Sequence, residues 1–313
     1  MILASDTSRV KYIMAHIGRF IETAGSMLGR GMKATEAPVV ATRKGEDRFD
    51  RSKRIPWFDL ETTRRAHVLV VGAGALGNEV VKNLVLSGVR HITLVDMDRV
   101  VRSNLNRCVF FTPEDAETSR PKVEAVAEGA ARLDASVEIV PENQRVEDLG
   151  EGVFTGKDVV VGCLDNLATR VHVNANAYWM RIPYVDGGTM GLMGKVHVVV
   201  PPDTSCVECT LNSSHYRIIE QRYSCTGVDT TFVEPKLASE VTTTAVVAAV
   251  ESREAMKMVN GRRDLVLRNL FYYDGNRNVS DVLEVAINPE CPNHAAEGQA
   301  AGEGAPEASG RGS

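Results

Sequence analysis

Short apolar runs alternate along the chain with longer segments in which apolar residues recur every three or four positions. The runs at 67–72 (HVLVVG) and 91–96 (HITLVD) are typical of strands buried on both faces of a sheet. Between them, residues 75–88 place Leu76 and Leu84 on one face of a helix. The same patterns predict further helices at 122–134, 166–181 and 241–259 and further strands at 137–140, 157–165, 194–200 and 269–276. Strands that alternate with helices favour an α/β fold with a doubly wound, mainly parallel sheet.

The two ends of the sequence differ from this middle part. Residues 8–34 carry apolar side chains at helical spacing, followed by glycines, so residues 1–45 are expected to form a helical arm that packs on the domain or makes a dimer contact. Residues 295–313 are rich in Gly, Ala and Glu without periodicity, which is typical of a disordered tail. These boundaries leave residues 46–294 as one domain.

Charge and composition narrow the classes of partner. The net charge is −5 and no run of five or six Lys or Arg residues occurs, which gives nucleic-acid binding little electrostatic support. No apolar run approaches the roughly 18 residues that cross a bilayer, and the first residues lack a signal-peptide pattern. We therefore expect a cytoplasmic protein without a membrane role, whose partners are small molecules or proteins. Six cysteines in 313 residues are too few for a disulfide scaffold.

A glycine-rich turn follows the first predicted strand. Gly72, Gly74 and Gly77 form G-x-G-x-x-G at the mouth of a helix, with Ala73 between the first two, and Asp96 ends the next strand. In such a turn bare backbone and a helix N-terminus face a phosphate, while the acid takes ribose hydroxyls. The pattern predicts a nucleotide but does not identify it, because a nicotinamide dehydrogenase would present the same turn.

The residues downstream of this turn favour a triphosphate. Cleaving ATP between its α and β phosphates requires several cations and a magnesium ligand where negative charge accumulates. The candidates are Asp98, Asn104, Arg107, Lys122, Asp165 and Asn166. Taken singly, Lys122 could lie on an exposed helix start and Asn104 could be an N-cap. Asp165 is harder to dismiss, because ligands of open α/β sheets bind at the carboxyl ends of strands.

Two pairs of possible metal ligands lie far apart in the sequence. Cys206 and Cys209 form C-x-x-C, and Cys291 and His294 have the same spacing. Three thiolates and one imidazole suit a tetrahedral, structural Zn²⁺ site. The alternatives are a redox dithiol for the first pair and a solvated side chain for His294.

Six motifs in this order and spacing resemble the adenylation domain of the ubiquitin-activating enzyme superfamily. They are EDRFDR (46–51), GAGALG (72–77), DMDRVVRSNLNR (96–107), SRPKVEA (119–125), CLDNLATR (163–170) and CVEC (206–209). The resemblance spans residues 46–294 and implies a Rossmann-like fold that binds ATP and Mg²⁺.

The resemblance also implies a role for individual residues. Asp96 would bind the ribose, while Asn104, Arg107 and Lys122 would hold the phosphates and Asp165 the Mg²⁺. Arg51 resembles an arginine that often reaches the ATP of a neighbouring subunit, so a homodimer is expected. The chain departs from the family pattern at Ser52 and Cys108, where glutamine is usual, and at His294, where a cysteine usually completes the zinc site.

Cys225 in RYSCTGVD (222–229) is the candidate nucleophile. The neighbouring His215, Arg217 and Arg222 would lower its pKa and favour the reactive thiolate. The plain alternative for a lone cysteine is a small buried apolar residue.

Read with the resemblance, SCTG after CVEC looks closer to the ubiquitin-, SUMO- and NEDD8-activating enzymes than to the sulfur-carrier adenylyltransferases. That implies adenylation of the C-terminal Gly-Gly of a ubiquitin-like protein, followed by a thioester on Cys225 and transfer to a conjugating enzyme. The alternative stops at the adenylate and delivers sulfur for cofactor synthesis or tRNA thiolation.

Overall fold

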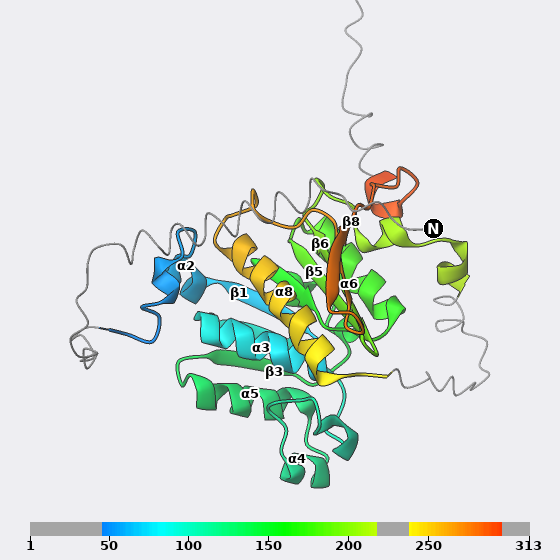
Figure 1. The fold of residues 1–313 in the computed structure, drawn as a ribbon. Coiled ribbons are helices and arrows are strands. Elements are labelled where there is room, and N and C mark those ends of the chain that lie inside the picture. The colour runs from blue at the N-terminus through cyan, green and yellow to red at the C-terminus, as the bar shows by residue number, and fades with distance from the viewer. Residues whose placement is uncertain (1–45, 218–237, 296–313) are drawn as a thin grey trace, which may run out of the picture. The chain divides into compact units, whose positions relative to one another are not determined.

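An eight-stranded sheet organises the structure, a computed structural model that describes residues 46–217 and 238–295 (Figure 1). The strand order is β3-β2-β1-β4-β5-β6-β7-β8, with parallel pairing from β3 to β5 and antiparallel pairing from β5 to β8. The strands are β1 (His67–Val71), β2 (His91–Val95), β3 (Glu138–Glu142), β4 (Val159–Gly162), β5 (Tyr184–Met190), β6 (Met193–Val199), β7 (Leu270–Asp274) and β8 (Val279–Leu283). The predicted α/β fold with a mainly parallel, Rossmann-like sheet is confirmed.

Helices cover both faces of this sheet, as a doubly wound fold requires (Figure 1). On one face α3 (Ala75–Ser87), α5 (Lys122–Leu133) and α8 (Val241–Val259) share an apolar core with the strands. On the other face α6 (Leu167–Trp179) packs over Phe154, Tyr184 and Cys291. Burial on both faces explains why the central strands read as continuous apolar runs.

Short helices connect the main elements. The α-helices are α2 (Leu60–Arg65) and α4 (Pro113–Glu117), and the 3₁₀ turns are η1 (Ser52–Arg54), η2 (Arg102–Asn104), η3 (Val146–Asp148), η4 (Glu151–Phe154) and η5 (Val207–Thr210). Side chains begin both α-helices: Asp59 accepts a hydrogen bond from the backbone N–H of Thr62, and Thr112 accepts one from Asp115.

Two strands and both short α-helices were not predicted. β5 contains Gly187 and Gly188, which weaken a strand pattern, and both positions need glycine because of tertiary contacts. A side chain on Gly187 would collide with the Glu251 carboxyl group, and one on Gly188 would crowd Arg170. β8 is exposed along its whole length, so it carries no buried apolar pattern.

The chain path creates a topological switch point at the carboxyl ends of β1 and β4, which we call the crevice. From β1 the chain runs outward to β2 and β3, and it then returns to form β4 on the other side of β1. At such a switch point the loops after the two strands separate, and ligands of open α/β sheets bind there. The loop after β1 holds the glycine turn, and the loop after β4 holds Asp165.

The expectations for residues 1–45 and 296–313 lie outside the described residues, and the domain boundaries remain predictions. Among the helices that the structure describes, none combines the length and apolarity needed to cross a bilayer.

Candidate functional site

The glycine turn after β1 uses its three glycines differently. Gly72 has a left-handed φ of 104°, and a Cβ there would collide with the carbonyl oxygen of Cys163 on β4's loop. A Cβ on Gly77 would collide with the carbonyl oxygen of Gly72, so this glycine permits close packing of helix on turn. Gly74 has no heavy atom within 4 Å of where a Cβ would lie. The protein itself therefore requires Gly72 and Gly77, while Gly74 leaves bare backbone beside open space.

The first turn of α3 is open to an anion. Its N-cap is Gly74, which offers no side-chain acceptor, and the turn carries no acidic residue. The N–H groups of that turn therefore keep their positive partial charge, which favours a phosphate at this end of the 13-residue helix.

Asp96 links the end of β2 to the glycine turn. Its Oδ2 accepts a hydrogen bond of 2.7 Å from the backbone N–H of Ala73, and its Oδ1 accepts one of 2.8 Å from Asp98. Burial raises the pKa of this carboxyl group, although the Lys122 ammonium and the two N–H donors oppose that rise. The acid thus stands at the rim of the turn, where a ribose acceptor is expected.

Lys122 is buried, so the alternative of an exposed helix start is wrong. Its Nζ lies 2.7 Å from Oδ2 of Asp98 and 4.0 Å from Oδ2 of Asp96. Burial opposes the positive charge, but the carboxylates of Asp96, Asp98 and Asp165 together raise the pKa of Lys122. A permanently charged ammonium therefore lies among three acids from the loops after β2 and β4.

Among the described residues, the side-chain hydrogen bonds of Arg107 and Asn104 are local. Arg107 Nη1 donates to the carbonyl oxygen of Ser103 and to Oδ1 of Asn106, the latter at 3.0 Å. Asn104 Oδ1 accepts a hydrogen bond of 3.1 Å from the backbone N–H of Val101, so Asn104 is the third residue of η2 and Val101 is the N-cap, contrary to the alternative left open for Asn104. The structure does not bond either residue to Lys122, and their phosphate contacts remain predictions.

The other predicted nucleotide ligands form no hydrogen bond with Lys122 in the described residues, although the Asp165 carboxylate acts on it electrostatically. Asp165 is exposed at the carboxyl end of β4, free of any recorded hydrogen bond in the described part of the chain. Asn166 caps α6 by accepting from the backbone N–H of Thr169 at 2.8 Å, so its side-chain oxygen already has a partner. Arg51 is exposed just before η1. Cys108 is buried, and burial raises the pKa of its thiol to about 11.

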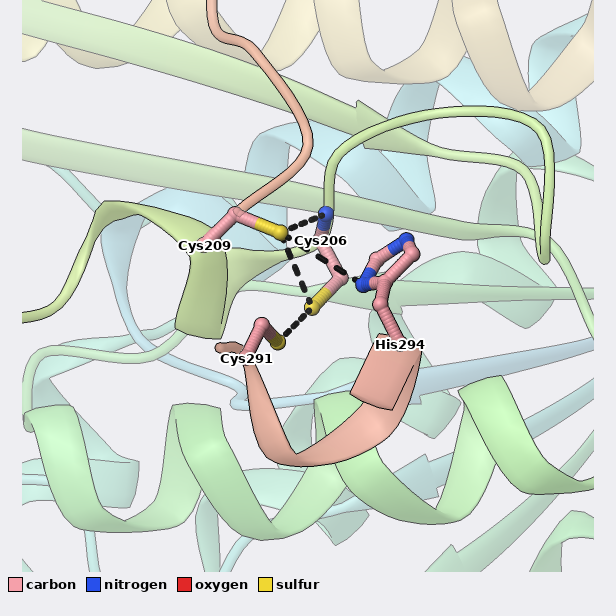
Figure 2. Close-up of side chains that lie close together, drawn as sticks. All are labelled: Cys206, Cys209, Cys291 and His294. Carbon is pink, nitrogen blue, oxygen red and sulfur yellow. Dashed lines mark hydrogen bonds between the residues drawn. The ribbon is translucent and has the colours of Figure 1, made fainter. Parts of the chain in front are cut away.

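The four predicted zinc ligands meet at one point, as Figure 2 shows. Cys206 Sγ lies 3.9 Å from Cys209 Sγ and 3.5 Å from Cys291 Sγ, and Cys209 Sγ lies 3.5 Å from Nδ1 of His294. All four donor atoms are within 4.8 Å of one another. A tetrahedral ion with Zn–S bonds near 2.3 Å would separate its sulfurs by about 3.8 Å, so the cluster can hold a metal ion of this kind. Four converging donors also argue against an isolated redox dithiol.

A second layer of hydrogen bonds orients these ligands. His294 Nε2 lies 3.2 Å from the carbonyl oxygen of Thr204, and donation there leaves the Nδ1 lone pair facing Cys209. Asn293 donates to Cys206 Sγ, and the backbone N–H of Cys206 donates to Cys209 Sγ. The predicted alternative of a solvated His294 is wrong, because its ring also packs 4.9 Å from the ring of Tyr178.

A buried polar network in the first half of β5 was not predicted from the sequence. Arg170 Nη1 lies 2.5 Å from Asp186 Oδ1, and the Tyr184 hydroxyl donates to the same oxygen at 2.8 Å. Arg170 Nη2 also donates to the carbonyl oxygen of Leu164, which precedes Asp165. Arg170 ends the CLDNLATR motif, so its position in the motif was the available signal.

The candidate nucleophile Cys225 lies outside the described residues, as does Arg222. His215 and Arg217 are described, but the structure does not test their effect on Cys225. The thioester therefore remains a prediction.

Comparisons with known proteins agree with the fold and the motifs. A family model described as the ThiF family matches residues 51–293. The NEDD8-activating enzyme E1 catalytic subunit of Caenorhabditis elegans is 32% identical over 181 residues, which cover 52% of this chain and 42% of that protein. SUMO-activating enzyme subunit 2 of Dictyostelium discoideum is 35% identical over 144 residues, 45% of this chain and 22% of that protein. The chain thus spans less than half the length of these two relatives.

Two further proteins match most of the chain. The molybdopterin-synthase adenylyltransferase of Salmonella typhimurium is 27% identical over 251 residues, which cover 78% of this chain and 94% of that protein. The crystal structure of E. coli MccB with ATP has a TM-score of 0.66 and 19% identity, covering 80% of this chain and 75% of that chain. At this identity the structural likeness shows a shared fold.

Proposed function

This chain belongs to the ThiF family, and on that premise we propose that it is an ATP- and Mg²⁺-dependent enzyme that adenylates the C-terminal glycine of a ubiquitin-like protein. The observation that carries the proposal is Lys122, a buried cation among three acids, one of which, Asp96, is hydrogen-bonded to Ala73 in the glycine turn. A site that only bound a dinucleotide would satisfy the pyrophosphate with backbone donors and would not need this cation. The names of the NEDD8-, SUMO- and molybdopterin-related relatives support the same class of reaction.

The reaction needs positive charge and alignment more than a base. A C-terminal carboxylate is already ionised at neutral pH, so one of its oxygens attacks the α-phosphorus directly while the bond to the bridging oxygen breaks and pyrophosphate leaves. In this proposal Lys122 and Arg107 offset the charge that grows on the phosphates, Asn104 orients them, and Asp96 holds the ribose. Mg²⁺, held by Asp165, would supply further neutralisation of the leaving pyrophosphate.

We assign the cysteine–histidine cluster to Zn²⁺ with a structural role. Its four positions are all filled by protein donors, so it offers no open position for a substrate. The described cysteines form no disulfide, which fits a reducing, cytoplasmic compartment.

The fate of the adenylate separates two candidate functions. In the first, Cys225 takes the acyl group as a thioester and passes it to a conjugating enzyme. In the second, the adenylate itself is delivered for sulfur transfer. The NEDD8- and SUMO-activating relatives favour the first, whereas the near-complete coverage of the molybdopterin-synthase adenylyltransferase favours the second.

One experiment tests the activity and the choice together. ATP–pyrophosphate exchange is measured with a panel of ubiquitin-like proteins ending in Gly-Gly, and the products are run on a gel with and without reductant. Exchange with at least one panel protein is expected, together with a reductant-sensitive band that is lost in Cys225→Ala. Exchange without that band would select the sulfur-carrier function, and no exchange with any member would refute adenylation.

Light scattering tests the expected homodimer, because a fully active monomer would contradict a role for Arg51 across subunits.

A further inference from the structure

Lys195 lies beside a buried ion pair whose charges already balance. The buried carboxylate of Asp186 already has one positive partner in Arg170, whose Nη1 lies 2.5 Å from Oδ1, and it accepts a second hydrogen bond from Tyr184. One guanidinium and one carboxylate balance each other, and the neighbouring Glu251 carboxyl group is counted as neutral because burial raises its pKa well above the usual value. Lys195 adds a further positive charge to this pair.

The contacts of Lys195 are incomplete. Its Nζ lies 3.9 Å from Oδ2 of Asp186, beyond hydrogen-bond distance, and that oxygen accepts no hydrogen bond in the described structure. The Lys195 side chain is 42% exposed, and no acceptor within the described residues is recorded for its ammonium. Burial of part of the side chain lowers the pKa of Lys195, Asp186 opposes that effect, and Arg170 adds to it. The Lys195 ammonium is therefore accessible to an anion from solution and has no hydrogen-bond acceptor among the described residues.

Lys195 lies toward the edge of the sheet where adenylation is proposed. Gly162 of β4 pairs with Asp186 of β5, and Lys195 of β6 pairs with Gly188, two residues beyond. At about 3.3 Å per residue, this places Lys195 roughly 7 Å further toward the crevice than the last β4–β5 pair. The loop after β4 runs along the same edge, and Arg170 holds Leu164 there, one residue before Asp165.

We propose that Lys195 binds the free C-terminal carboxylate of the incoming polypeptide and sets it against the α-phosphate, an inference that rests on the proposed adenylation. The tail carboxylate and the phosphate are both anions and repel each other. A half-exposed ammonium beside a neutral Arg170–Asp186 pair offsets that repulsion without closing the site. It also makes recognition depend on a free carboxylate, because an amidated tail would leave the ammonium without its partner.

The test compares Lys195→Met with a matched control, Lys157→Met, in the full-length protein. Lys157 is also half-buried, but it lies at the amino end of β4, where its Nζ donates to Thr93 at 2.7 Å. In pyrophosphate exchange with the panel protein that supports it, Lys195→Met is expected to raise KM for that protein by about tenfold or more. KM for ATP should change less than twofold, and Lys195→Arg should recover most of the loss.

The second readout is the charge of the tail. The same panel protein is prepared with a free C-terminal carboxylate and with a C-terminal amide, and its binding is measured by titration. The wild-type chain should bind the acid about tenfold more tightly than the amide, and Lys195→Met should bind both equally. If Lys195→Met behaves like Lys157→Met, or keeps the preference for the acid, the inference is wrong while adenylation stands. If no panel protein supports exchange, both fall.

Discussion

The metal cluster and the nucleotide crevice both bring together side chains from distant parts of the sequence. They differ in which partners those side chains have within the protein. In the cluster, three thiols and one imidazole face one another, and no Lys or Arg side chain of the described residues is ion-paired with them. In the crevice, Lys122 already has protein partners, because it is ion-paired with Asp98 and Asp96. The difference fits the proposals made for the two regions. A bound metal ion would balance the donors of the cluster, whereas Lys122 would exchange protein partners for phosphates.

Loss of the metal ion should have the largest effect. Cys206→Ser is expected to lose bound zinc and at least about 3 kcal/mol of unfolding free energy, because structural zinc contributes on the order of 10 kcal/mol in small zinc domains. Metal analysis and thermal denaturation with and without a chelator measure both. His294→Ala should behave similarly, whereas His172→Ala, a half-buried histidine on α6, should keep its zinc. A His294→Ala protein with full zinc content would contradict the ligand assignment.

Removing the Lys122 ammonium should strongly reduce activity without unfolding the protein. Lys122→Met is expected to lower kcat/KM for pyrophosphate exchange by about 10²- to 10³-fold, as for loss of one group that stabilises transition-state charge. Arg132→Met removes a positive charge from the far end of the same helix and should leave exchange within twofold. Equal exchange rates for wild type and Lys122→Met would break the comparison, because the buried cation would then be structural.

The glycines should separate folding from binding. Gly72→Ala forces a side chain into a left-handed backbone and against Cys163, so it should cost about 1–3 kcal/mol of stability. Gly74→Val should leave the melting temperature nearly unchanged, because its Cβ meets open space, while raising KM for ATP by about tenfold or more. Denaturation and exchange kinetics on both variants decide this. An unstable Gly74→Val protein with normal ATP binding would reverse the assignment.

The smallest expected effect concerns a buried acid that belongs to neither region. Glu251 on α8 is fully buried against Gly187, neither carboxyl oxygen has a hydrogen-bond partner among the described residues, and burial raises its pKa well above the usual value. The folded chain keeps this proton while the unfolded chain loses it above about pH 4.3, so the free energy of unfolding falls as pH rises. Glu251→Gln should therefore stabilise the protein more at pH 8 than at pH 5 in thermal melts. An equal gain at both pH values would show that Glu251 is ionised.

Some of these features could be predicted from the sequence and others could not. β1 and β4 were predicted because strands that are buried on both faces carry continuous apolar runs. β5 was missed because its glycines are explained only by Glu251 and Arg170, which lie elsewhere in the chain. The ligand pairs were found 85 residues apart because metal chemistry fixes their local spacing. The burial of Lys122 could not be predicted, since it depends on how the loops after β2 and β4 fold together.

With the proposed ion bound, the metal cluster would also close the chain into a ring from Cys206 to His294, a ring that includes α8, β7 and β8. Its two ends stay joined whatever the length of the segment between them, and each doubling of a flexible loop costs only about 0.6 kcal/mol. Extra sequence could therefore enter this ring with little penalty to the core. Such a fold could accept an inserted domain between these two points while its core folds as before.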